Sequence, residues 1–213
     1  MNSHVPISLS WVLFLFALAA GVSAGYLAGG RLSRLRIPST IVFGALLAFA
    51  VQIGLAWLPA RWFGLGARYG LLIATYAAFF LTLVVASVRL RGRLPGLPGI
   101  VAIGLVFAGW ALNTAPIVAN AGMPVPRSAL VAAGYAPDQN PSRLGREWKH
   151  VLTTGKSELA GLGDTVAVQP LHAVYSIGDF LLLAGIAAMV AAGMRGEFDA
   201  RPGPADYRLG IVV

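Results

Sequence analysis

The sequence predicts an all-α membrane protein, a bundle of five transmembrane helices with a long outer loop segment that contains short helices. Its 213 residues are 57% hydrophobic and 11% charged, and the mean hydropathy is +0.75. About a quarter of the residues in a soluble domain are charged, so this composition belongs in lipid. Five apolar runs approach the roughly 20 residues that cross a bilayer core. We expect transmembrane helices at about residues 11–28, 40–58, 69–88, 99–118 and 177–194.

The first four expected helices are separated by short segments that hold Arg and Pro residues. The first helix carries Gly21, Gly25 and Gly29 at a spacing of four, which places them on one face where a second helix can approach closely. Pro38 precedes the second helix, and Pro98 precedes the fourth. The glycine face predicts tight packing of the first helix, and the alternative is that membrane helices simply tolerate glycine.

The fifth expected helix begins at a capping box. The Ser176 hydroxyl can accept a hydrogen bond from an amide one turn into the helix, and the Asp179 carboxylate can reach back to the N–H of Ser176. A stripe of small residues, Ala184, Ala188 and Ala192, follows on one face. The capping box predicts the helix start, and the stripe predicts a packing face.

The distribution of Arg residues predicts the topology. Nine Arg residues lie in the segments after the first and third helices and in the tail 195–213, whereas the N-terminus has no Lys or Arg and segment 59–68 has two. The positive-inside rule then places the N-terminus outside and the C-terminus in the cytoplasm. We expect a transmembrane domain at 1–194 in the cell inner (plasma) membrane, with an outer segment at 120–175 and a disordered cytoplasmic tail.

The charge and composition limit the classes of partner. A net charge of +8 does not indicate nucleic-acid binding here, because the Arg residues stand in short runs between apolar segments. The chain has no Cys, which excludes disulfides, thiolate nucleophiles and Cys-based metal sites. The expected partner is the lipid bilayer, together with a larger membrane complex or a second copy that docks on the small-residue faces.

The outer segment is too long to be a plain connection. Residues 126–133 are expected to form a short helix, with Pro at its start and Gly134 just past its end. Residues 135–146 are rich in turn formers. Residues 148–162 are expected to lie along the membrane interface, with Trp148 at headgroup depth. We expect this segment to form a lid over the outer ends of the helices.

Uncommon polar residues gather in the outer half of the expected bundle. Their depth along each helix places Gln52, Tyr76, Asn113 and Asp179 there, which predicts a cavity open to the extracytoplasmic side. Each has a simpler explanation, because amides can bridge helices for about 0.6 kcal/mol on average, and a carboxylate can act only as a helix cap. The candidate ligand-binding residues are Gln52, Asn113, Asn120, His150, Asp164, His172 and Asp179.

The residue types on the outer side also include metal donors. His and carboxylate side chains suit zinc or iron, yet no ligand spacing such as H-E-x-x-H occurs, and no metal is assigned. A Ser-His-Asp hydrolase lacks support because the chain has no G-x-S-x-G motif. No catalytic residue and no cofactor are assigned.

Several short motifs are arranged as in a known family. They are Gly29-Gly-Arg-Leu32, Asn120-Ala-Gly-Met-Pro-Val125, Lys149-His150, Leu162-Gly-Asp164 and Ser176-Ile-Gly-Asp179, together with Gln52 and Asn113. Over about residues 9–192, their order and spacing resemble the bacterial membrane family catalogued as domain of unknown function 5317. The resemblance implies a multi-helix membrane protein with no assigned activity. Two departures stand out: Ala121 replaces the first of two usual glycines, and Thr165-Val166-Ala167 replaces a usual Ile-Ile-Pro.

We expect a protein that binds or transports a small polar or lipid-derived ligand in an outward cavity. Two other classes stay open. An outward-facing membrane enzyme would pair a His with an Asp of the outer side as acid and base, and a non-catalytic subunit would dock on a larger membrane complex. His150, Asp164 and Asp179 within about 3 Å of one another would favour the enzyme.

The topology is tested by reporter fusions along the chain. Fusions after Arg36, Arg93 and Arg208 are expected to report cytoplasm, and a fusion after Gln139 is expected to report the outside, because the Arg residues concentrate on one side. An external signal at Arg93 would invert the orientation and place the polar residues on the cytoplasmic side.

Overall fold

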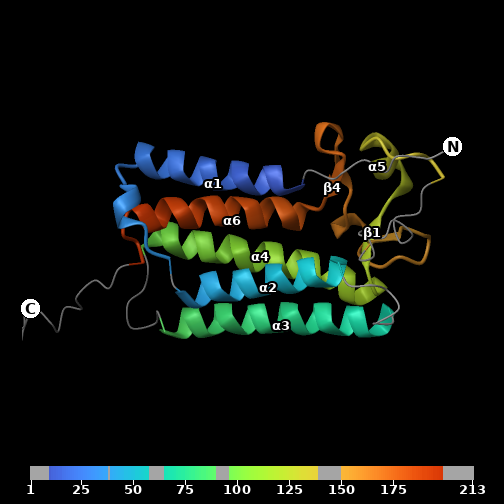
Figure 1. Cartoon of the computed structure of the whole chain (residues 1–213), viewed down its shortest axis with the longest axis horizontal. Coiled ribbons are helices and arrows are strands. Elements are labelled where there is room, and N and C mark those ends of the chain that lie inside the picture. The colour runs from blue at the N-terminus through green and yellow to red at the C-terminus, as the bar shows by residue number, and fades with distance from the viewer. Residues whose placement is uncertain (1–9, 38, 58–64, 90–95, 139–149, 199–213) are drawn as a thin grey trace, which may run out of the picture.

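Five long helices run alongside one another in the computed structural model (Figure 1). The structure describes residues 10–37, 39–57, 65–89, 96–138 and 150–198. Each expected long helix has a helix at its place. Their bounds are Ser10–Leu27 (α1), Ser39–Trp57 (α2), Leu65–Arg89 (α3), Leu97–Asn120 (α4) and Ile177–Met194 (α6). Within the described ranges, α4 and α6 are long and apolar enough to cross a membrane, judged by length and composition.

The segment between α4 and α6 forms a folded cap at one end of the helices (Figure 1). We use the word cap for residues 121–138 and 150–175. The short helix predicted at 126–133 is present as α5, which comes after the first strand. Gly134 lies beyond its end and has a φ of +93°. The elements of the cap are β1 (Met123–Val125), α5 (Arg127–Ala132), β2 (His150–Leu152), the 3-10 turns η3 (Ala160–Leu162) and η4 (Gln169–Leu171), β3 (Val166–Val168) and β4 (Ala173–Tyr175).

The strands of the cap were not predicted from the sequence. β1 pairs with β2 in parallel, with Met123 opposite His150, and β3 pairs with β4 in antiparallel fashion, with Val166 opposite Tyr175. Residues 150–152, which were expected to lie along the membrane interface, form β2, and their position relative to a membrane stays a prediction. Trp148 and the turn-rich residues beyond 138 lie outside the described residues, as does the tail beyond 198.

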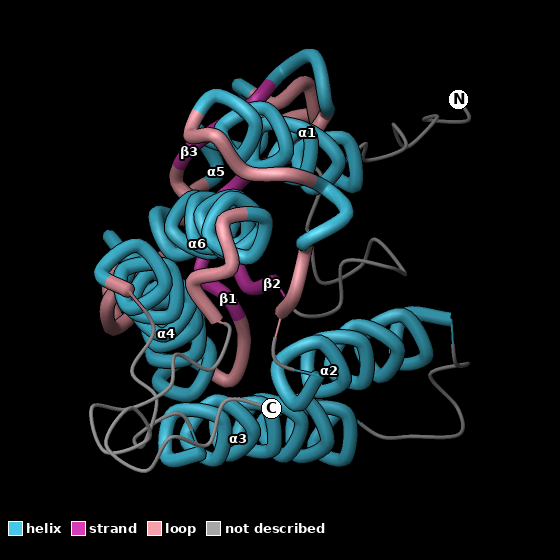
Figure 2. The backbone as a smooth tube through the Cα atoms, turned by 90° about the vertical axis from the view of Figure 1, so that its left-hand side faces the viewer, coloured by secondary structure: helices cyan, strands magenta, loops and turns pink. Residues whose placement is uncertain are grey.

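Helix α6 packs between α1 and α4 (Figure 2), and glycines make the approach close. A Cβ on Gly21 of α1 would lie 2.6 Å from the carbonyl oxygen of Ala187, so the predicted glycine face of α1 is confirmed at this residue. A Cβ on Gly185 of α6 would lie 2.8 Å from the backbone nitrogen of Val106 on α4. The predicted alanine stripe of α6 is confirmed at Ala188, which packs on the core, and at Ala192, which is buried, but it is wrong at Ala184, which is exposed.

Helices α2 and α3 pack on each other as a hairpin, and α3 contacts α4. The ring of Phe80 on α3 stacks on Trp110 of α4 with centroids 4.9 Å apart. Large apolar side chains are exposed on the outer faces of the helices, for example Phe16 (69% exposed), Phe43 (67%) and Leu81 (61%). Exposed apolar surface of this extent is typical of a membrane or protein contact.

A matched pair of glycines on α4 tests the close packing. A Cβ on Gly109 would lie 2.6 Å from the carbonyl oxygen of Gly178, whereas a Cβ on Gly104 would meet nothing within 4 Å. Gly109→Ala is therefore expected to destabilise the protein by about 1–3 kcal/mol, the usual cost of overpacking. Gly104→Ala is expected to be neutral or stabilising by up to about 1 kcal/mol, because Ala is the better helix former. Thermal unfolding in detergent compares the two, and equal midpoints would contradict the observed packing.

Candidate functional site

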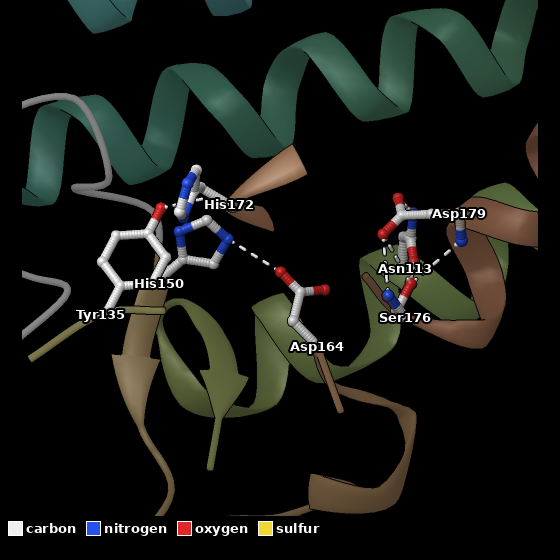
Figure 3. A network of polar contacts seen from close by, with 7 residues as sticks. All are labelled: Asn113, Tyr135, His150, Asp164, His172, Ser176 and Asp179. Atoms are coloured by element: carbon white, nitrogen blue, oxygen red, sulfur yellow. Dashed lines mark hydrogen bonds and ion pairs between the residues drawn. The ribbon is translucent and has the colours of Figure 1, made fainter. Parts of the chain in front are cut away.

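Asn113, Ser176 and Asp179 form a hydrogen-bonded network between α4 and α6 (Figure 3). The Asn113 Nδ2 donates to Asp179 Oδ1 at 2.7 Å, and the Ser176 hydroxyl donates to Asn113 Oδ1 at 2.5 Å. Both halves of the predicted capping box are present, because the Asp179 N–H donates to Ser176 Oγ at 3.0 Å and the Ser176 N–H donates to Asp179 Oδ2 at 2.9 Å. We call these three residues the α4–α6 network.

The α4–α6 network is closed on itself. Asn113 and Ser176 are buried, at 8% and 0% exposure. Since an ionised carboxylate only accepts hydrogen bonds, the amide nitrogen of Asn113 must face Asp179. Both oxygens of Asp179 and the oxygen of Asn113 then have a donor within the network. The network therefore fixes α6 against α4 and starts the helix.

Asn120, the last residue of α4, holds the cap. Its Nδ2 donates to the carbonyl of Glu158 at 2.7 Å and to the carbonyl of Pro116 at 2.8 Å, and its Oδ1 accepts the N–H of Glu158 at 2.9 Å. These two bonds to the backbone of one residue, Glu158, attach the middle of the cap to the end of α4. Ala121 follows in the left-handed region with φ +50°, a conformation that favours glycine.

His150 and Asp164 form a buried pair in the cap. The His150 Nε2 lies 2.8 Å from Asp164 Oδ2, and the two residues are 7% and 3% exposed. β2 positions the His, and the Asp164 N–H donates to the Pro124 carbonyl of β1 at 2.9 Å. Among the described residues, the other carboxylate oxygen, Asp164 Oδ1, is buried and has no hydrogen-bond partner. The pair therefore presents one oxygen that the described chain does not satisfy.

His172 and Tyr135 connect the two halves of the cap. The Tyr135 hydroxyl donates to the His172 carbonyl at 2.9 Å, and the His172 Nδ1 lies 3.1 Å from the Ala133 carbonyl oxygen. His172 adopts φ +45° as the residue that ends η4. These contacts give His172 a role in holding α5 against the turn before β4.

The predicted site residues thus divide into separate groups. The α4–α6 network lies apart from the His150–Asp164 pair in Figure 3, so Asp179 does not join the pair as an acid and base. No group of three or more His, Cys, Asp or Glu residues arranged for a metal occurs in the described part of the chain. Gln52 lies in α2, and its side chain lies outside the described residues.

One polar group of the cap was missed from the sequence. The Thr153 hydroxyl is buried and, within the ranges that the structure describes, has no hydrogen-bond partner. Thr153 directly follows β2, and its N–H donates to the Val125 carbonyl at 2.9 Å. No sequence motif marks this residue, because its burial depends on a strand pairing between distant segments.

The fold and these contacts define a mostly helical protein with two helices suited to span a membrane and a folded cap between them. The chain belongs to a family of unknown function, DUF5317, whose model matches residues 37–191. The resemblance found in the motifs is therefore confirmed. Neither the search of curated proteins nor the search of solved structures finds a match to the chain.

A double-mutant cycle tests the α4–α6 network. Asn113→Ala and Asp179→Ala each remove one end of the 2.7 Å bond, and their coupling is expected to be about 0.6–1.7 kcal/mol, the range for hydrogen bonds between membrane helices. The control is a second cycle that combines Thr114→Ala with Asp179→Ala. The Thr114 hydroxyl donates to the Trp110 carbonyl of its own helix, so no coupling with Asp179 is expected. Unfolding in detergent measures the coupling. Additive losses in the Asn113 cycle would show that the two side chains do not stabilise each other.

Proposed function

We propose that this chain is a five-pass protein of the plasma membrane whose cap faces the extracytoplasmic side and binds a small polar ligand. The five helices run alongside one another and expose apolar side chains on their outer faces, and both observations support the membrane embedding. The connection that carries Arg31, Arg34 and Arg36 lies at the end of the helices opposite the cap (Figure 1). This separation of basic residues from the cap favours a cytoplasmic C-terminus and an outer cap.

The unsatisfied oxygen of Asp164 carries the proposal. A buried polar group without a partner costs roughly 1–3 kcal/mol, and a charged one costs more. Proteins rarely leave such a group unpaired unless a water, an ion or a ligand satisfies it. The Asp164 carboxylate is 3% exposed, and its second oxygen lacks a donor in the described chain. A ligand that brings an N–H, an O–H or a positive charge would supply that donor.

The surroundings of Asp164 hold its oxygen in a fixed place. The backbone N–H of Asp164 bonds β1, and the His150 ring on β2 fixes the other carboxylate oxygen. β1 follows α4 directly, and the Asn120 bonds attach the cap to the same helix end. A site built on hydrogen-bonded elements keeps its geometry before the ligand arrives, which lowers the cost of binding.

An outward-facing enzyme is the second candidate, and the His150–Asp164 pair favours it. A carboxylate bonded to one ring nitrogen of a His selects the tautomer and the orientation of the ring, which is the arrangement used to prepare a general base. Turnover would require a third reacting group beside the pair. Asp179, the expected third group, bonds Asn113 and Ser176 instead, so ligand binding is the simpler function for this geometry.

Asp164→Asn separates a binding role from a structural role. The variant keeps the size of the side chain and removes the charge, so a molecule that co-purifies with the wild-type protein in mild detergent is expected to be lost. Stability without ligand is expected to stay within about 1 kcal/mol of the wild type, because the Asn carbonyl oxygen can still accept a hydrogen bond from His150. Mass spectrometry of bound small molecules and thermal unfolding provide the two measurements.

Asp138→Asn is the matched control, since Asp138 is an exposed acid of the same cap. It is expected to retain the molecule and the stability of the wild type. A loss of about 1.5–3 kcal/mol in Asp164→Asn, with bound molecules unchanged, would show that Asp164 only anchors His150 and would overturn the binding role.

A further inference from the structure

An apolar groove lies between α2 and α3, away from the cap site. Its volume is about 240 Å³, and its lining includes Phe43, Gly44 and Leu47 of α2 and Ala74, Ala78 and Thr82 of α3. The small side chains of Ala74 and Ala78 leave space in the groove, whereas Gly44 is buried against Thr82 and lets the two helices approach closely. Phe43 and Leu47 are 67% and 47% exposed, so the groove opens on the outer surface of the hairpin.

The groove has little hydrogen-bonding capacity of its own. The Thr82 hydroxyl donates to the Phe79 carbonyl at 2.7 Å, and the Thr75 hydroxyl, which also lines the groove, donates to the Leu71 carbonyl at 2.7 Å. Both threonines therefore satisfy their donors within α3. An occupant has to be apolar along this length.

Basic residues stand at one end of the groove. Arg31, Arg34 and Arg36 are exposed and immediately precede α2, which starts at Ser39. Phe43, the first groove residue of α2, lies four residues further on, a rise of roughly 6 Å along a helix. The connection that leads into α2 therefore carries positive charge at the helix end nearer to Phe43.

We propose that the groove holds one acyl chain of an anionic glycerophospholipid whose phosphate lies at Arg34 and Arg36. The volume is below the roughly 300–1,000 Å³ of sites that enclose a whole ligand, so it suits one chain of a molecule that otherwise stays in the bilayer. A second copy of this chain would bring no acidic residue on α1, α2, α3 or α4, because the first acidic residue in the sequence is Asp138. Basic residues at the cytoplasmic end of a membrane helix attract anionic lipid.

This inference rests on the membrane embedding proposed above, and it is independent of the ligand at Asp164. The experiment presents the full chain in mild detergent with an equal mixture of dioleoyl phosphatidylglycerol and dioleoyl phosphatidylcholine. Native mass spectrometry then counts the bound molecules of each lipid. The wild-type protein is expected to retain phosphatidylglycerol in excess. Equal retention of the two lipids would overturn the anionic assignment without any variant.

Ala78→Phe fills the groove, and Ala77→Phe adds the same ring at an exposed position of α3 that does not line it. Ala78→Phe is expected to reduce bound phosphatidylglycerol about tenfold, the change that corresponds to roughly two fewer buried methylenes. Ala77→Phe is expected to bind as the wild type does. Ala78→Leu repeats the test with a smaller side chain. Equal binding by the Ala78 and Ala77 variants would overturn the groove as the site, as would dissociation of a dimer by Ala78→Phe with lipid unchanged.

A charge variant tests the headgroup position. Arg34→Gln combined with Arg36→Gln is expected to bring phosphatidylglycerol binding down to the level of phosphatidylcholine. Arg127→Gln removes a charge from the cap end and is expected to leave the preference unchanged. A preference that survives the double variant would overturn the proposed position of the phosphate.

Discussion

The close contact of α6 with α4 is the constraint on which the rest of the structure depends. The backbones approach at Gly109 and Gly178, where a Cβ on Gly109 would lie 2.6 Å from the Gly178 carbonyl oxygen. In lipid, helices gain little from the hydrophobic effect and associate through van der Waals packing and hydrogen bonds, which small residues allow. The same approach brings Asn113 within 2.7 Å of Asp179. The polar network therefore depends on the glycine contact, and each reinforces the other.

The position of the cap follows from this contact. The α4–α6 network starts α6 at Ser176, one residue after β4 ends, so it fixes where the cap returns to the helices. Asn120 fixes where the cap leaves α4, and it also ties Glu158 to the helix end. With both ends held, the strand pairs of the cap have little freedom to shift. His150 and Asp164 are therefore held in place by contacts that begin in the bundle.

Features that depend on neighbouring residues were predictable from the sequence, and features that depend on distant pairing were not. The run lengths located all five long helices, and the Ser176–Asp179 spacing located the start of α6. The strands have only three residues each, which is too short to show an alternating pattern in the sequence. β1 also pairs with β2 across a long gap in sequence. The alanine stripe was confirmed at Ala188 and Ala192 and was wrong at Ala184, because a spacing of four identifies a face without telling which of its turns meet a neighbour. The expected depth of each residue in the membrane grouped Asn113 with Asp179. The hydrogen bond between the two side chains is seen only in the structure.

The buried polar groups differ in the free energy that it costs to bury each of them with the hydrogen bonds it has. Asn113, Ser176 and Asp179 satisfy one another, so they stabilise the fold without requiring anything further. Among the described residues, the indole N–H of Trp110 and the hydroxyl of Thr153 lack partners, but both groups are neutral and cost less to bury than a charge. Within the same described ranges, Asp164 Oδ1 also lacks a partner. Oδ2 of this carboxylate bonds His150, but a carboxylate oxygen without a donor costs more to bury than a neutral group does. Within the described chain, Asp164 Oδ1 is therefore the buried atom whose missing hydrogen bond costs the fold most, and this is the observation behind the proposed ligand.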